Sequence, residues 1–138
     1  MSARRVVGPV MLILAITAAA CAGDAAGPAL TDTALAEEGC AHVVDVAATG
    51  DGATRTFEVT VESADTGWEK YANAWEIRSP AGDVLGVREL THPHVDEQPF
   101  TRSLSGVVIP DGVGEVTVVA RDSVAGFCGE TVTVALSD

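Results

Sequence analysis

The sequence predicts an all-β domain, a sandwich of seven antiparallel strands in two sheets, over residues 40–138. Three observations favour this fold class. From His42 onward apolar and polar residues alternate with a period of two, and helical spacing is nearly absent. The alternating stretches are short and are separated by turns rich in glycine and proline. Finally, 47% of the 138 residues are hydrophobic, which is enough for one packed core.

The first three strands follow from this alternation in chain order. His42–Thr49 (HVVDVAAT) ends at the turn Gly50-Asp51-Gly52. Arg55–Ser63 (RTFEVTVES) alternates most clearly, because its phenylalanine and valines face one way and its threonines and glutamates face the other. After a loop, Ala72–Ser79 (ANAWEIRS) is the third strand, with Trp75 and the isoleucine two residues later pointing inward.

The other four strands are separated by clear breaks. Val84–Leu90 (VLGVREL) follows a Pro-Ala-Gly-Asp turn, and two prolines then exclude a central strand from Thr91–Pro99. Phe100–Val108 (FTRSLSGVV) comes next and ends near a Pro-Asp-Gly turn. Glu115–Asp122 (EVTVVARD) and Thr131–Leu136 (TVTVAL) complete the set, and we expect the domain to be a monomer.

The N-terminal residues 1–20 have the pattern of a secretory signal peptide. Arg4 and Arg5 precede an apolar run that is too short for a membrane span. The next residues, Ala18-Ala19-Ala20-Cys21, resemble a bacterial lipobox. This resemblance implies cleavage before Cys21, which becomes the new N-terminus and receives diacylglycerol on its thiol, with palmitate as a fatty acid of the anchor. It also implies anchoring to the extracytoplasmic face of the cell membrane. An ordinary signal peptide with a coincidental cysteine is the alternative.

Residues 21–39 are predicted to be a flexible linker, because they are rich in alanine and acidic residues, lack aromatics and have little apolar surface to bury. The whole chain has 20 acidic and 8 basic residues, for a net charge of −12. Nucleic acid is therefore excluded as a partner, because phosphate binding needs a basic face. The charge also argues against electrostatic docking on anionic lipid.

The chain has three cysteines, and lipidation would use one of them. In an oxidising compartment the other two, Cys40 and Cys128, are most simply a disulfide, with a cysteine-based metal site as the alternative. Residues 40–138 also resemble an immunoglobulin or fibronectin type III domain, with Trp75 in the place of the buried tryptophan of such folds. That resemblance places the first strand beside the last, which would bring Cys40 and Cys128 to the same end.

Because consecutive strands run in opposite directions, every second loop lies at the same end of the sandwich, and candidate functional residues lie together there. The loops after the second, fourth and sixth strands emerge there, together with the start of the first strand. These segments hold all three histidines and several aromatic and acidic residues: His42, Trp68, Tyr71, His92, His94, Asp96, Glu97 and Phe127. Loops on a rigid scaffold are common binding sites, so this end is the candidate functional site.

Three interpretations of this end remain open. His92 and His94, completed by His42, Asp96 or Glu97, would suit copper or zinc. In a structural interpretation the two imidazoles cap carbonyls or pair with carboxylates, and the aromatic residues cover the end of the core. The third is a recognition surface for an envelope protein or a glycan, with Trp68, Tyr71 and Phe127 as its anchors.

Catalytic motifs are not evident in the sequence. There is no nucleophile elbow, phosphate-binding glycine loop, CxxC or HExxH pattern, so we expect no enzyme and no required cofactor.

Arg102 lies on the same side of its strand as inward-facing residues, so its guanidinium needs a carboxylate partner. Asp96 or Glu97 in the neighbouring loop could supply that carboxylate. The stretch His92–Ser105 resembles uncharacterised bacterial secreted domains. The sequence thus favours a membrane-anchored lipoprotein acting as a non-enzymatic binding module, with a copper- or zinc-binding lipoprotein as the alternative.

Overall fold

The computed structural model describes residues 39–137. The predicted signal peptide, the lipidation site Cys21 and the predicted linker up to residue 38 lie outside the described residues. Within residues 39–137 no helix has the length and apolar character needed to cross a membrane.

The described chain forms seven strands and no helix, and each strand coincides with a predicted one to within one residue at either end. They are β1 (His42–Thr49), β2 (Thr54–Glu62), β3 (Ala72–Arg78), β4 (Val84–Glu89), β5 (Phe100–Val108), β6 (Glu115–Asp122) and β7 (Val132–Ala135). The predicted all-β class is therefore confirmed.

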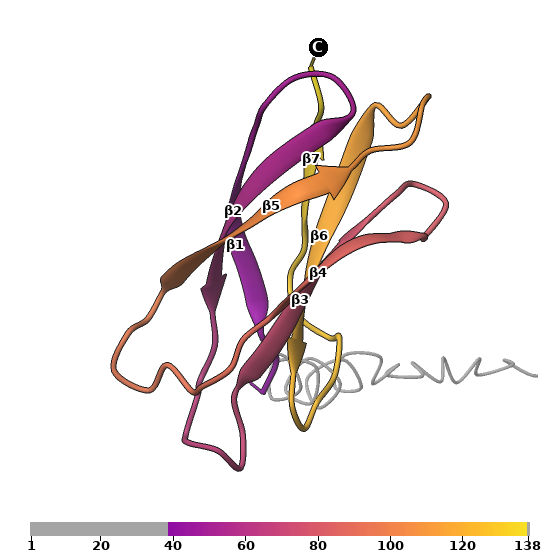
Figure 1. The fold of residues 1–138 in the computed structure, drawn as a ribbon. Helices are drawn as coiled ribbons and strands as arrows, with labels where there is room; N and C mark the ends of the chain where they lie inside the picture. Colours follow the sequence, from indigo (N-terminus) through magenta and orange to yellow (C-terminus); the bar gives the residue numbers. More distant parts are fainter. Residues whose placement is uncertain (1–38, 138) are drawn as a thin grey trace, which may run out of the picture.

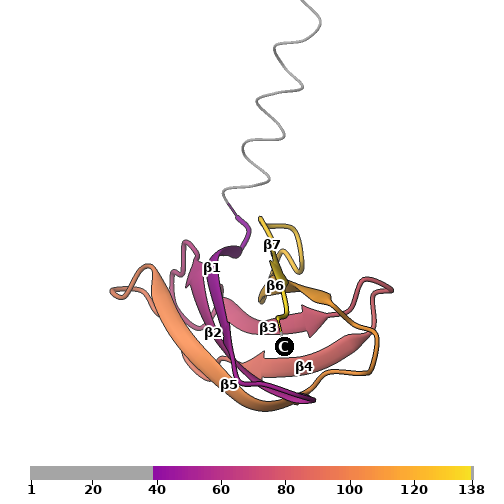
Figure 2. The ribbon, with the colours of Figure 1, turned by 90° about the horizontal axis from the view of Figure 1, so that it is seen from above.

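The strands form two antiparallel sheets, with the orders β1-β2-β5 and β4-β3-β6-β7. Figure 1 shows β6 and β7 running along the long axis of the domain and β5 crossing it obliquely. In the view from above, the sheets form two layers, with β1 next to β7 at one edge and β5 next to β4 at the other (Figure 2). The two inner faces enclose the core, which is how such sheets bury their apolar side.

Inward-facing side chains of both sheets fill the core. The largest fully buried apolar side chains are Phe57, Val59 and Val61 of β2, Trp75 and Ile77 of β3, Phe100 of β5, and Val116 and Val118 of β6. Trp75 is buried as expected from its place in the third strand.

One arginine of β4 lies on the inner side of its sheet. Arg88 pairs directly with buried Trp75, so the two side chains share the same face. Its Nε atom is buried without a hydrogen-bond partner in the described chain. Arg88 lies in the regular part of the β3–β4 pairing, two residues before buried Leu90 and on the same side, so the partner strand sets its side.

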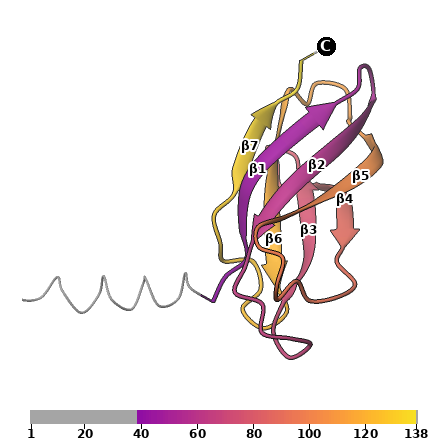
Figure 3. The ribbon, with the colours of Figure 1, turned by 90° about the vertical axis from the view of Figure 1, so that its left-hand side faces the viewer.

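The predicted disulfide between Cys40 and Cys128 is present, with a Cα–Cα distance of 5.4 Å. It joins the start of β1 to the segment before β7, and these two strands lie side by side in Figure 3. The backbone N–H of Val43 also donates to the carbonyl of Glu130 at 2.9 Å. Gly129 is required here, because a Cβ atom at this position would lie 1.9 Å from the carbonyl oxygen of Ala41.

The loops β2–β3, β4–β5 and β6–β7 emerge together at the end where β1 begins, the lower end in Figure 1. The strands therefore place the predicted loop residues at one end of the domain, as their alternating directions require. This loop end contains the candidate site.

Candidate functional site

A buried ion pair fixes the β2–β3 loop to the rest of the loop end. The carboxylate of Asp122, at the end of β6, is fully buried and accepts a hydrogen bond from Lys70 Nζ at 2.5 Å. It also accepts the backbone N–H groups of Val124 and Ala125 at 2.8 and 2.9 Å. Burial alone would raise the pKa of Asp122, but these hydrogen bonds outweigh it and lower the pKa below that of an ordinary aspartate.

Lys70 closes the tip of the same loop, where Trp68 is presented to solvent. Its backbone N–H donates to the carbonyl of Gly67 at 3.2 Å, and its own carbonyl accepts the N–H of Thr66 at 3.0 Å. The Trp68 side chain is 68% exposed and meets the Tyr71 ring edge-on, with 5.8 Å between ring centroids. The tip is therefore held by backbone and lysine contacts while one large aromatic ring stays open to solvent.

Asp65 joins the β2–β3 loop to the β4–β5 loop. This buried carboxylate accepts the backbone N–H of Ala72 through Oδ1 and that of His94 through Oδ2, both at 2.9 Å. Gln98 adds a second connection, since its side chain accepts the N–H of Ser63 and donates to the carbonyl of His94, again at 2.9 Å. The sequence analysis did not assign these roles to Asp65 and Gln98, because their partners lie in other loops.

The His94 ring closes the end of the core. It is 3% exposed and stacks on Phe100, with 3.8 Å between centroids and an angle of 8° between planes. The centroid of the exposed His92 ring lies 4.5 Å from the centroid of the His94 ring. Neither ring nitrogen of His94 has a hydrogen-bond partner among residues 39–137. The expectation that this imidazole pairs with a carboxylate is wrong, because it serves as a stacked aromatic lid.

Burial is the main cause that lowers the pKa of His94 below its ordinary value of 6.5. Electrostatic interactions with Arg102 and His92 lower it further, and the carboxylates of Glu97 and Asp65 oppose the shift only in part. His94 is therefore neutral at pH 7, with one ring nitrogen a donor and the other an acceptor.

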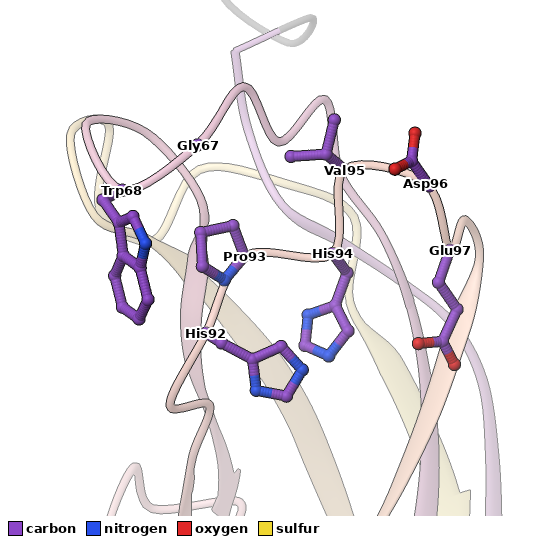
Figure 4. Close-up of a pocket in the computed structure, with 8 residues that line it drawn as sticks. All are labelled: Gly67, Trp68, His92, Pro93, His94, Val95, Asp96 and Glu97. Atoms are coloured by element: carbon purple, nitrogen blue, oxygen red, sulfur yellow. The ribbon is translucent and has the colours of Figure 1, made fainter.

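Arg102 has the partner that the sequence analysis expected. Its guanidinium donates to both oxygens of Glu97 at 3.1 and 3.3 Å, and it lies 5.6 Å from the centre of the Phe100 ring. The hydrogen bond from Arg102 lowers the pKa of Glu97. In Figure 4 the Asp96 carboxylate points away from both imidazoles, so it does not join this group.

These loops enclose an open cleft of about 570 Å³. Figure 4 shows Trp68 on one side, the imidazoles of His92 and His94 in the middle, and Glu97 on the other side. The lining residues are Gly67, Trp68, His92, Pro93, His94, Val95, Asp96 and Glu97. Five predicted site residues thus meet at one cleft.

The remaining predicted residues lie elsewhere or only adjoin the cleft. His42 accepts the backbone N–H of Glu130 at 3.0 Å and lines a different hollow, so it is not beside His92 and His94. Phe127 is 42% exposed and packs against the guanidinium groups of Arg78 and Arg121, at 4.6 and 6.0 Å from the ring centre. It does not cover the core end, which His94 closes instead.

Metal ligands do not cluster in the described part of the chain. Among residues 39–137 no group of three or more histidine, cysteine, aspartate or glutamate side chains is placed to hold a metal ion. His92 and His94 are the one pair of adjacent imidazoles that the described loops form, and they are the residues that would hold copper or zinc.

Comparison with known proteins finds one informative relative. A protein of Halomicrobium mukohataei named "Putative lipoprotein" is 39% identical to this chain over 95 residues. The match covers 68% of this chain and 46% of the relative, so the chain spans less than half of the relative's length. No protein-family model matches, and no solved structure matches. The relative's name supports a lipoprotein with a location at the membrane or envelope.

Proposed function

We propose that this chain is a lipoprotein anchored through Cys21 to the extracytoplasmic face of the membrane, and that its β-sandwich is a non-enzymatic binding module. We also infer an immunoglobulin-like sandwich. The strand orders β1-β2-β5 and β4-β3-β6-β7, with β1 beside β7 and with Trp75 buried, support it. The binding partner is an envelope protein or a glycan.

One observation carries the binding role. Trp68 is exposed to 68% at the tip of a loop that a buried ion pair holds in place. An exposed tryptophan costs solvation free energy, and such residues are the commonest anchors of binding sites. A fixed backbone reduces the entropy that the loop would lose when a partner binds.

The residues around the cleft support a role without catalysis. The side chains that line it include no serine, threonine, cysteine or lysine that would act as a nucleophile. The glutamate at its edge is already engaged by Arg102. These features favour binding over covalent chemistry.

The anchor is tested with a Cys21→Ser variant of the full-length chain in cells supplied with labelled palmitate. We expect the wild type to carry the label and to sediment with membranes, and the variant to lose both properties. Equal membrane retention of both proteins, with no label on the wild type, would contradict the anchor.

The binding role is tested by crosslinking the full chain to intact envelopes. Trp68→Ala should reduce crosslinking, and Phe127→Ala is the matched control because it removes another exposed aromatic ring outside the cleft. Equal crosslinking by the Trp68→Ala variant and the wild type would refute the role of the cleft.

A second candidate is binding of copper or zinc by His92 and His94. The observation that favours it is the contact between the two imidazoles together with the unpartnered nitrogens of His94. Calorimetry of the full chain with Cu(II) and Zn(II) tests it. Binding tighter than about micromolar that a double His92→Ala, His94→Ala variant abolishes would support the metal site. Weak binding that the variant retains would exclude it.

A further inference from the structure

The cleft between Trp68 and His92 combines an open aromatic face with unused polar groups. We propose that this cleft binds a neutral sugar ring, which deepens the binding role proposed above and rests on it. The argument uses the shape of the cleft, the hydrogen-bonding capacity of its imidazoles and the charge around it.

The first element is the indole of Trp68. The edge of the Tyr71 ring meets it at 74°, and it remains 68% exposed. Figure 4 shows the indole beside the cleft, across from Pro93 and His92. A flat apolar face beside polar groups suits the face of a pyranose ring, whose C–H groups lie on one side and whose hydroxyls lie around its edge.

The second element is the pair of imidazoles. His94 is almost fully buried at the cleft, and neither of its ring nitrogens has a partner in the described chain. Buried polar atoms without partners are rare in folded proteins and indicate a missing ligand or water. His92 is exposed directly beside this ring, where a ligand contacts it first.

The chemistry of a neutral imidazole restricts the ligand. The neutral ring of His94 offers one donor and one acceptor, so its best partner is a group that both accepts and donates. A hydroxyl group does both, whereas a carboxylate or phosphate oxygen only accepts and an ammonium group only donates. A hydroxyl at the edge of a sugar ring therefore matches His94 better than a charged group does.

The third element is charge. The whole chain carries a net charge of −12, which repels anionic ligands. An ammonium group is not favoured either, because Arg102 neutralises Glu97 and the Asp96 carboxylate points away from the imidazoles (Figure 4). A neutral ligand is not repelled by the negative charge of the chain and does not need a free carboxylate. The cleft of about 570 Å³ is widely open to solvent, so a ligand there would keep one side exposed.

The test uses the full chain in detergent and a panel of neutral di- and trisaccharides built from common hexoses and N-acetylhexosamines. Saturation-transfer NMR reports binding through the sugar signals, so it does not depend on tryptophan emission. We expect saturable binding of at least one sugar, unchanged between low and high salt. Trp68→Ala should weaken it by at least about tenfold, because truncation of a binding-site tryptophan removes a main anchor. Phe127→Ala should leave it unchanged.

Three results would overturn the inference. They are no saturable binding across the panel, equal binding by the Trp68→Ala variant, and binding that disappears at high salt. Competition then separates this inference from the binding role itself. If Trp68→Ala abolishes crosslinking to envelopes but no neutral sugar competes, the binding module stands and the sugar ligand is wrong. If a lysine-rich peptide competes instead, the partner is a basic protein.

Discussion

Replacing Lys70 by methionine isolates the contribution of the buried ion pair to the loop end. Methionine keeps most of the aliphatic length of lysine and removes the ammonium group. The change leaves the Asp122 carboxylate fully buried, with its two backbone N–H donors but without its cation. It also removes the hydrogen bond from Lys70 Nζ to the carbonyl of Gly39 at 2.9 Å.

The expected loss of unfolding free energy follows from these contacts. Removing one partner of a buried ion pair costs about 3–5 kcal/mol when the remaining charge is left uncompensated. Here the remaining carboxylate keeps two backbone hydrogen bonds, and the Lys70 side chain is itself 25% exposed. We therefore expect Lys70→Met to destabilise the domain by about 2–3 kcal/mol.

Guanidinium unfolding of the wild type and the variant measures this loss as a shift of the midpoint at constant slope. Arg102→Met is the matched control, because the Arg102–Glu97 pair has a glutamate side chain that is 57% exposed. An exposed pair contributes little to stability, because solvent and salt screen it, so the control should be close to the wild type. Equal midpoints for Lys70→Met and Arg102→Met would refute the argument that burial makes the first pair important.

Three other changes have defined outcomes. Replacing both cysteines of the disulfide, which are 88 residues apart, should cost about 4–5 kcal/mol on the loop-entropy model, and denaturant midpoints measure the loss. Stability should fall as the pH drops below about 6.5, because the lowered pKa of His94 means that the unfolded chain takes up its proton first. His94→Phe should reduce this dependence in unfolding experiments from pH 7 to 5. Gly129→Ala should destabilise by about 2 kcal/mol or more, because the new Cβ overlaps the backbone of Ala41, whereas Gly114→Ala meets open space and should be nearly neutral in the same assay.

Strand positions were predictable because each depends on a local pattern. Period-two alternation in β2 and β6 is visible without knowledge of any partner strand, and Gly/Pro turns mark where each strand ends. The disulfide was predictable by a different route, since two cysteines remained after lipidation was assigned. The Arg102–Glu97 pair was also anticipated, because an inward arginine requires a nearby carboxylate.

The details of the loop end were not predictable, because they depend on residues distant in sequence. The burial of His94 needs Phe100 beneath its ring and the Asp65 carboxylate on its backbone N–H, and neither contact leaves a sequence pattern. The inward position of Arg88 follows from its pairing with Trp75 of β3, a contact that the β4 sequence alone does not reveal. His42 shares the loop end with the other histidines, but a backbone contact with Glu130 holds it in a different hollow.

Lys70 connects the start of the described chain to the candidate cleft. Lys70 Nζ holds the carbonyl of Gly39, where the described chain begins, and its backbone closes the tip that presents Trp68. With Cys21 lipidated as proposed, the cleft lies at the end of the domain from which the anchor departs. A linker over residues 21–39 spans at most about 65 Å when fully extended. With this proposed anchor, the part of a partner that contacts the cleft would lie within about this distance of the membrane.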